Sequence, residues 1–275
     1  MIDRHILSLG AGVQSTTLYL MAIHGDFPCQ AAIFADTQEE PEAVYAHLEW
    51  LKAQSGPPIM VRTRGSLGDD LTRGENSTHQ RFASIPAFTS DGINSPSMTR
   101  RQCSREYKTQ VVEQTIRREI VGLAPGRALP KDVQIIQYIG ISWDERSRAF
   151  DVERRMKRGW KAIFPLLDRQ WTRADCREFL NYNVPHEVPK SACVFCPFHN
   201  NNQWARLKAQ GGKDWDRIVQ IDTALRTPGT VVNRNLQQSL YLHRSCKPIT
   251  EIDFANSKQG SFDGFLMECQ GVCGV

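Results

Sequence analysis

The sequence predicts an α/β fold in which a parallel sheet carries helices on both of its faces. Short apolar runs of strand length alternate along the chain with longer segments of helical spacing, a pattern typical of such sheets. The first apolar run ends at a glycine-rich turn that opens an apolar helix. The 275 residues suffice for one large α/β domain or for a domain with an appendage.

The individual elements follow from local pattern. Apolar runs predict strands at residues 5–9, 29–35, 58–62 and 133–142. Helical spacing predicts helices at residues 16–24, 41–53, 104–121, 172–181, 200–208 and 215–226. Thr37 and Glu40 predict a capping box before the second helix, which Pro41 then opens. Residues 65–99 are rich in Gly, Ser, Thr, Asp and Pro, which predicts a long surface loop.

Ligands of a parallel sheet bind at the carboxyl ends of its strands. That edge would gather residues 8–15, 36–37 and 140–148. We therefore expect a nucleotide-binding α/β domain over residues 1–168. The remainder, residues 169–275, is expected to be a helical region with a Cys-x-x-Cys site and a cysteine-containing tail.

The loop at residues 8–16 reads Ser-Leu-Gly-Ala-Gly-Val-Gln-Ser-Thr. Glycines let backbone amides point inward, and the helix N-terminus adds unpaired donors and partial positive charge, so a phosphate fits there. Three interpretations stay open: a plain turn capped by Ser15, a dinucleotide-binding turn with Asp36 on the ribose, and a pyrophosphatase-type loop. A Walker-type loop is excluded, because no lysine follows the glycines.

The net charge and the hydropathy pattern exclude few classes of protein. The chain has 34 basic and 30 acidic residues, a net charge of +4, which does not by itself indicate nucleic acid. Basic residues gather within 146–161, either as a solvated helical face or as a lip over an anionic substrate. We find no signal segment and no apolar run long enough for a bilayer, which predicts a cytoplasmic protein without membrane contact.

Eight cysteines in that compartment indicate thiols, redox groups or metal ligands rather than disulfides. Cys193 and Cys196 form a Cys-x-x-Cys pair whose spacing suits two thiolates on one metal. Thioredoxin-like redox chemistry is the rival, although the pair lies late in the chain. Cys103 is the best third ligand, and the candidates for a fourth are Cys246, Cys269, Cys273 and His199. Cys29 and Cys176 lie in apolar segments and are expected to be core thiols.

Five segments together resemble the adenine nucleotide α-hydrolase superfamily of PP-loop ATP pyrophosphatases, and within it proteins related to phosphoadenosine phosphosulfate reductase. They are the loop at 8–16, Phe-Ala-Asp-Thr at 34–37, Gln-Cys-Ser-Arg-Glu-Tyr-Lys at 102–108, the stretch at 139–148, and the stretch at 165–172 leading to Cys193 and Cys196. The chain departs from the family where Gln14 replaces an aspartate of the loop and Gln102 replaces a cysteine. Its C-terminal Glu268-Cys269 and Cys273-Gly274 only partly resemble the reductases' Glu-Cys-Gly tail.

The resemblance implies a Rossmann-like, HUP-type sheet with a helical C-terminal extension, and it implies roles for particular residues. Nucleotide phosphates, ribose or adenine would be bound by Ser8, Gly10, Gly12, Gln14, Ser15, Thr16, Asp36, Thr37, Arg105, Gly140 and Arg148, with Lys108 also facing phosphate. Asp144 and Glu145 would bind Mg²⁺ or orient a nucleophile. A [4Fe–4S] cluster, with zinc as the alternative, would be held by Cys103, Cys193, Cys196 and Cys246. Cys269 and Cys273 would act as exchanging or catalytic thiols.

Two enzyme classes and one binding class follow from these expectations. In the first, ATP adenylates an acceptor, such as a base of tRNA or DNA, and a sulfur donor then displaces AMP. In the second, a tail thiolate reductively cleaves an adenylyl sulfate with the help of a thiol reductant. The third is a nucleotide- and cluster-sensing module that binds tightly without turnover. We favour the adenylating class, because Gln102 and the altered tail depart from a plain reductase.

Overall fold

The computed structural model describes residues 1–76, 85–90, 96–227 and 239–255. Its centre is a five-stranded parallel sheet in the order β3-β2-β1-β6-β7. The strands are β1 (Ile2–Leu9), β2 (Ala31–Asp36), β3 (Ile59–Thr63), β6 (Val133–Tyr138) and β7 (Trp160–Ile163). The predicted α/β class, with a Rossmann-like parallel sheet, is confirmed.

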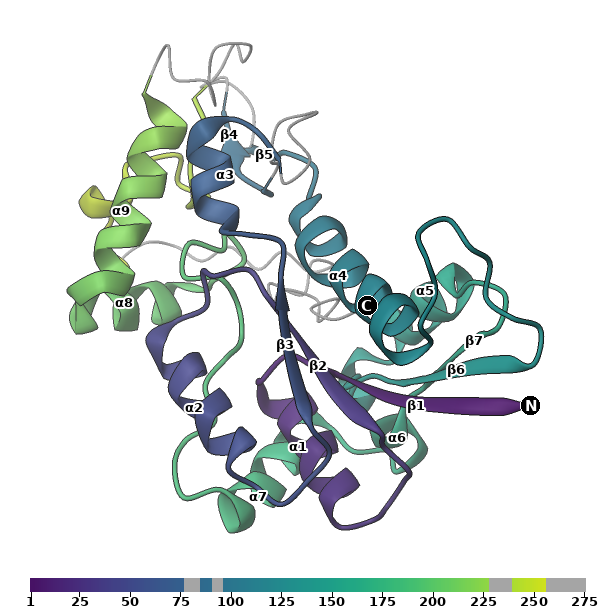
Figure 1. Cartoon of the computed structure of the whole chain (residues 1–275). Coiled ribbons are helices and arrows are strands. Elements are labelled where there is room, and N and C mark those ends of the chain that lie inside the picture. The colour runs from purple at the N-terminus through teal and green to yellow at the C-terminus, as the bar shows by residue number, and fades with distance from the viewer. Residues whose placement is uncertain (77–84, 91–95, 228–238, 256–275) are drawn as a thin grey trace.

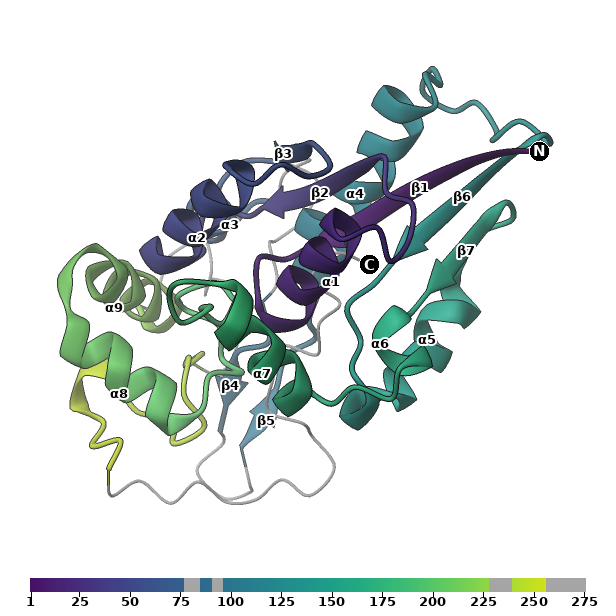
Figure 2. The ribbon, with the colours of Figure 1, turned by 90° about the horizontal axis from the view of Figure 1, so that it is seen from below.

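Helices cover both faces of this sheet (Figure 1). One face carries α1 (Val13–Ile23), α2 (Glu42–Lys52), α6 (Pro165–Asp168) and α7 (Arg173–Asn183). Figure 2 shows α1 and α7 side by side against the strands. The other face carries α4 (Gln110–Thr115), extended by the π-helical turns η1 (Ser104–Thr109) and η2 (Ile116–Ile120), and α5 (Ser147–Arg155).

Alternating side chains of the strands serve the two faces. Leu7 and Leu9 of β1 belong to the apolar cluster under α1, whereas Ile6 belongs to the cluster under α4. In β7, Ile163 packs on the α1 side, and Ala162 packs against α5. Strands buried on both faces read as continuous apolar runs, which is why the sequence reveals them so readily.

A third apolar cluster lies beyond the carboxyl ends of β2 and β3, in the upper left of Figure 1. It joins α3 (Leu67–Arg73), α8 (Asn201–Gln210), α9 (Gly212–Arg226), η4 (Ile249–Glu251) and residues near the short hairpin of β4 (Phe88–Thr89) and β5 (Ser97–Met98). Its largest fully buried side chain is Trp204.

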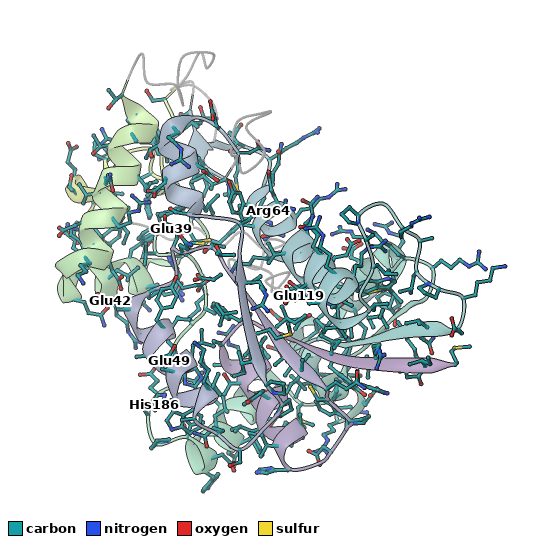
Figure 3. All side chains as sticks on the ribbon, viewed as in Figure 1. Glu39, Glu42, Glu49, Arg64, Glu119 and His186 are labelled. Carbon is teal, nitrogen blue, oxygen red and sulfur yellow. The ribbon has the colours of Figure 1, made fainter. Side chains whose placement is uncertain are left out.

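An ion pair ties this third cluster to the sheet. Glu39, just beyond β2, accepts from Arg217 of α9 at 2.6 Å and 3.0 Å, and from the Ser66 hydroxyl at 2.6 Å. Figure 3 shows Glu39 between α2 and the pair α3 and α9. A Cβ on Gly68 would stand 2.4 Å from Glu39 Oε1, so only glycine leaves room for this pair. The 3-residue turn η3 (Trp143–Glu145) completes the described elements.

Two local predictions were wrong, and the strand β7 was missed. The stretch 65–99 is not one irregular loop, because α3 lies in it, with Ser66 Oγ accepting from Asp69 N and Gly74 ending the helix at φ 72°. Thr37 and Glu40 form no capping box, since α2 begins after Pro41 without a side-chain cap. β7 has only 4 residues beside charged neighbours and was not predicted as a strand.

The helix predicted at 104–121 is present but irregular. It runs as π-helical turns on both sides of a single α-helical segment. Such wide turns are rare and occur often at functional sites. Among the described residues, no helix is long and apolar enough to cross a membrane.

Candidate functional site

A pocket lies at the carboxyl ends of β1 and β6, the central strands between which the strand order reverses. Parallel α/β sheets bind ligands at this switch point. Eight residues expected from the sequence line it: Ser8, Gly10, Gly12, Gln14, Ser15, Gly140, Glu145 and Arg148. Its volume of about 70 Å³ suits a phosphate group, with the rest of a ligand lying outside.

The loop between β1 and α1 is held in shape by its own serine. Ser15 Oγ accepts from Gly10 N at 3.1 Å and from Gly12 N at 3.2 Å, and donates to Gly12 O. Ala11 takes the left-handed conformation at φ 55°. These two glycine amides are therefore occupied, and the first amides of α1, which have no partner within the helix, remain as donors for an anion.

Close backbone packing explains two of the glycines. A Cβ on Gly140 would stand 3.0 Å from Ser15 N and 3.1 Å from Gln14 Cβ. A Cβ on Gly12 would stand 3.3 Å from Ser191 Cβ. Glycine thus lets the segment after β6 and the segment before Cys193 close on the α1 N-terminus from two sides.

A buried polar array forms one wall of the pocket. Glu145 Oε2 accepts from Gln14 Nε2 at 3.2 Å and from Arg148 Nη1 at 2.5 Å. Gln14 Nε2 also lies 3.4 Å from Ser142 Oγ. The Arg148 side chain is 8 % exposed, and its buried Nε has no hydrogen-bond partner among the described residues. A buried guanidinium with an unused donor at the pocket wall is suited to an anionic ligand.

Three further lining residues were missed by the sequence interpretation. Arg173 begins α7, and Lys190 and Ser191 precede the Cys-x-x-Cys pair. Together with Arg148 they give the pocket three basic side chains against the one carboxylate of Glu145. No local signal marks them, because they reach the pocket only through the packing of α7 and of residues 189–191 against the first loop.

Six residues expected around the nucleotide do not line this pocket. The Thr16 side chain is buried between α1 and α2, with Oγ1 2.9 Å from His47 Nε2. Asp36 Oδ1 accepts from Gln38 N at 2.7 Å and from the Tyr45 hydroxyl at 2.8 Å. Burial and this contact raise the pKa of Tyr45. Thr37 Oγ1 lies 3.2 Å from Cys193 Sγ.

The other three lie elsewhere. Asp144 Oδ1 accepts from Arg173 N at 3.1 Å and so caps α7. Arg105 is exposed and lines a separate cleft between α4 and α5. Lys108 Nζ lies 2.8 Å from Glu40 Oε1 in a buried ion pair and does not line the pocket. Glu40 Oε2 also accepts from Ser191 Oγ at 3.1 Å.

The cysteines that the structure describes lie in several places. Cys103 and Cys193 pack in the same apolar cluster, and Cys196 N donates to Cys193 O. Burial, the largest effect, raises the pKa of Cys193 well above its ordinary value. Cys246 sits instead in a turn with His243.

Across the described ranges, no group of three or more His, Cys, Asp or Glu side chains is placed to hold a metal. Binding of a cluster or a zinc ion by Cys103, Cys193, Cys196 and Cys246 therefore stays a prediction from the sequence. His199 Nε2 lies 3.0 Å from Cys193 O, and burial lowers the pKa of His199 to about 4. Cys269 and Cys273 lie outside the described residues.

Cys29 and Cys176 pack in the cluster under α1 as expected. Burial raises the pKa of Cys29 to about 11 and that of Cys176 to about 12.

Comparison of the chain with protein-family models, with curated proteins and with solved structures gives no match.

Proposed function

We propose that this chain is a PP-loop-like enzyme that binds ATP and transfers its adenylyl group to an acceptor. The observation that carries the proposal is Arg148, a buried arginine with an unused Nε, beside the α1 N-terminus at the sheet's switch point. Helix N-termini and arginine are both suited to phosphate. The three basic lining residues add positive charge where a polyphosphate would lie.

Magnesium bound with a nucleotide usually takes one or two carboxylates together with phosphate oxygens. Glu145 is the carboxylate that lines this pocket, so it would hold the ion and neutralise phosphate charge. In the proposed reaction a nucleophilic atom of the acceptor attacks the α-phosphorus. The bond from that phosphorus to the bridging oxygen breaks, and pyrophosphate leaves with the electron pair. A second nucleophile, a sulfur donor or water, then attacks the adenylylated acceptor, and AMP leaves.

The test is a binding and product analysis with Mg-ATP and with phosphoadenosine phosphosulfate. We expect saturable Mg-ATP binding by calorimetry, and AMP plus pyrophosphate as products, increased by added tRNA or DNA. Sulfite and adenosine bisphosphate from the sulfonated nucleotide, with ATP untouched, would instead make the chain a reductase. Tight nucleotide binding without turnover of either would make it a sensing module.

Two variants connect the binding to this pocket. Arg148→Lys keeps a charge beside Glu145 but removes Nε, and we expect Mg-ATP affinity to fall about tenfold, as for loss of one charge-assisted hydrogen bond. Arg154→Lys is the matched control, because Arg154 lies on the same helix, exposed, and pairs with Asp151 at 3.0 Å. Equal affinities for both variants would contradict the assignment of the phosphate site.

A further inference from the structure

A second cavity lies between α4 and α5 on the face of the sheet opposite α1. Its volume is about 650 Å³, and η1, α4, α5, β6 and β7 all contribute to its walls. That volume falls within the range typical of small-molecule sites, about 300–1,000 Å³. We call it the α4–α5 cleft. The pocket at the α1 N-terminus, which we call the phosphate pocket, is far smaller. The two cavities therefore suit ligand groups of different size.

The α4–α5 cleft adjoins the phosphate pocket. Gln137 lines the cleft, and its Nε2 donates at 2.7 Å to the hydroxyl of Ser8, which lines the pocket. Helix α5 also serves both cavities, since it places Arg148 in the pocket and Val152 and Arg155 in the cleft. A substrate in the cleft would therefore lie beside a nucleotide whose phosphates occupy the pocket.

The cleft is strongly basic. Four basic side chains line it against one carboxylate, that of Glu113, which already pairs with Lys157. The guanidinium groups of Arg105 and Arg155 form no hydrogen bond or ion pair with any described residue. Two such arginines in one cleft suit a ligand that carries phosphate.

Apolar side chains lie beside these charges. Val152 is buried, and Met156 and Trp160 are half-buried with surface left facing the cleft. Indole rings stack on nucleobases, and arginine contributes both charge and stacking. A phosphate together with a flat aromatic ring is the chemistry that matches this combination.

We infer that the α4–α5 cleft is the acceptor site and binds a nucleotide unit, with phosphate on Arg105 and Arg155 and the base on Trp160. The unit comes either as a free mononucleotide or within a single-stranded oligonucleotide. The assignment of the cleft as acceptor site rests on the proposed function. Binding of a nucleotide unit there is testable without any turnover.

The experiment measures binding of a labelled eight-nucleotide single strand, as RNA and as DNA, to the full chain by fluorescence anisotropy. We compare Arg105→Gln/Arg155→Gln with Arg154→Gln/Arg158→Gln, which removes the same charge from exposed positions of 146–161. The cleft variant should lose at least tenfold in affinity, and the control less than about twofold, because unspecific attraction depends on total charge. Equal losses in both variants, or no saturable binding by the unaltered chain, would overturn the inference.

Two further measurements identify the form of the nucleotide ligand and the position of its base. If AMP or UMP displaces the strand, a free mononucleotide is sufficient to fill the cleft. If the strand binds but neither mononucleotide displaces it, the ligand is a single-stranded oligonucleotide. Trp160→Leu should weaken strand binding about tenfold through lost stacking while leaving its salt dependence unchanged. Unchanged affinity in that variant would overturn the placement of the base.

Measuring both Mg-ATP binding and strand binding in each variant separates the cleft assignment from the proposed ATP site. The cleft variant should bind Mg-ATP normally, whereas Arg148→Lys should lose Mg-ATP affinity and keep strand binding. If the cleft variant loses Mg-ATP affinity instead of strand affinity, the cleft belongs to the first nucleotide and the inference is wrong. If Mg-ATP binds nowhere but the strand still depends on Arg105 and Arg155, the proposed function fails alone.

Discussion

At the scale of single residues, Gly140 tests how tightly the phosphate pocket is built. A Cβ at this position would meet the backbone of Ser15 and Gln14, which cannot rotate away as a side chain could. Gly140→Ala should push the first loop outward. Overpacking of this kind costs about 1–3 kcal/mol, so we expect Mg-ATP affinity to fall about tenfold in a chain that still folds. Calorimetric titration and circular dichroism measure the two quantities.

The control for Gly140 is another glycine whose substitution causes strain away from the site. Gly126 has φ 77°, and a methyl group added there would meet no described atom within 4 Å, so Gly126→Ala strains only its own backbone. Its stability should fall by about 1 kcal/mol, because L-residues disfavour the left-handed region. If both variants lose Mg-ATP affinity equally, general destabilisation rather than the pocket explains the effect.

At the residue scale, the sequence predicts those pocket-lining residues that come from contiguous chain. Ser8, Gly12 and Gln14 were found because a strand, a turn and a helix follow one another within a few residues. Gly140 and Arg148 were found because a second strand ends beside the first. Arg173 and Lys190 were not found, since only tertiary packing brings them there. The Thr16 side chain does not line the pocket, because the helical phase of α1 turns it toward His47.

At the scale of elements, the N-terminus of α7 shows a full capping box. Thr172 Oγ1 accepts from Asp175 N, and Asp175 Oδ2 accepts from Thr172 N at 2.7 Å. Thr172→Ala should therefore reduce the free energy of unfolding by about 1 kcal/mol. Urea unfolding measures this, with Asn181→Ala as an exposed control within the same helix. An equal loss in the control would show that the box contributes nothing of its own.

Long elements with a clear apolar pattern were predicted well, whether or not they meet the main sheet, whereas two short elements were missed. The strands β1, β2, β3 and β6 are continuous apolar runs, but β7 is too short to produce such a pattern. Helix α3 was missed although Ser66, Gly74 and the apolar pair Leu67 and Leu71 mark it. The many turn residues around α3 hid those signals. The apolar face of α3 packs on α9 rather than on the sheet.

At the scale of the whole molecule, the Glu39–Arg217 pair joins the sheet to the third cluster. The Glu39 side chain is 3 % exposed, so loss of Arg217 leaves a buried carboxylate without its cation. Arg217→Met should lower the free energy of unfolding by about 3 kcal/mol or more. Adding Glu39→Gln should recover part of that loss, because the buried charge is then absent.

A second pair between the same two helical regions provides the control. Lys213 of α9 and Glu42 of α2 lie 3.7 Å apart, and both side chains are exposed. Exposed pairs contribute about 0–1 kcal/mol, so Lys213→Met should change urea unfolding very little. If Arg217→Met were as mild as Lys213→Met, the third cluster would be held by its apolar contacts alone.

Acid sensitivity is also a property of the whole fold. His47, His199 and His243 are buried in separate places, and burial lowers the pKa of each to about 4 from 6.5. Between these values the unfolded chain binds protons that the folded chain does not, so stability is full above pH 6.5 and falls as pH decreases toward 4.

Removing one of these groups should make the fold less sensitive to acid. His243 hydrogen-bonds Asn201 and Ser245, and His243→Gln keeps a polar side chain there. The difference in unfolding free energy between pH 7 and pH 5 should shrink by about 2 kcal/mol in this variant, since one proton is no longer taken up on unfolding. Urea titrations at the two pH values measure it. An unchanged difference would mean that the His243 imidazole takes up its proton in the folded chain as readily as in the unfolded one.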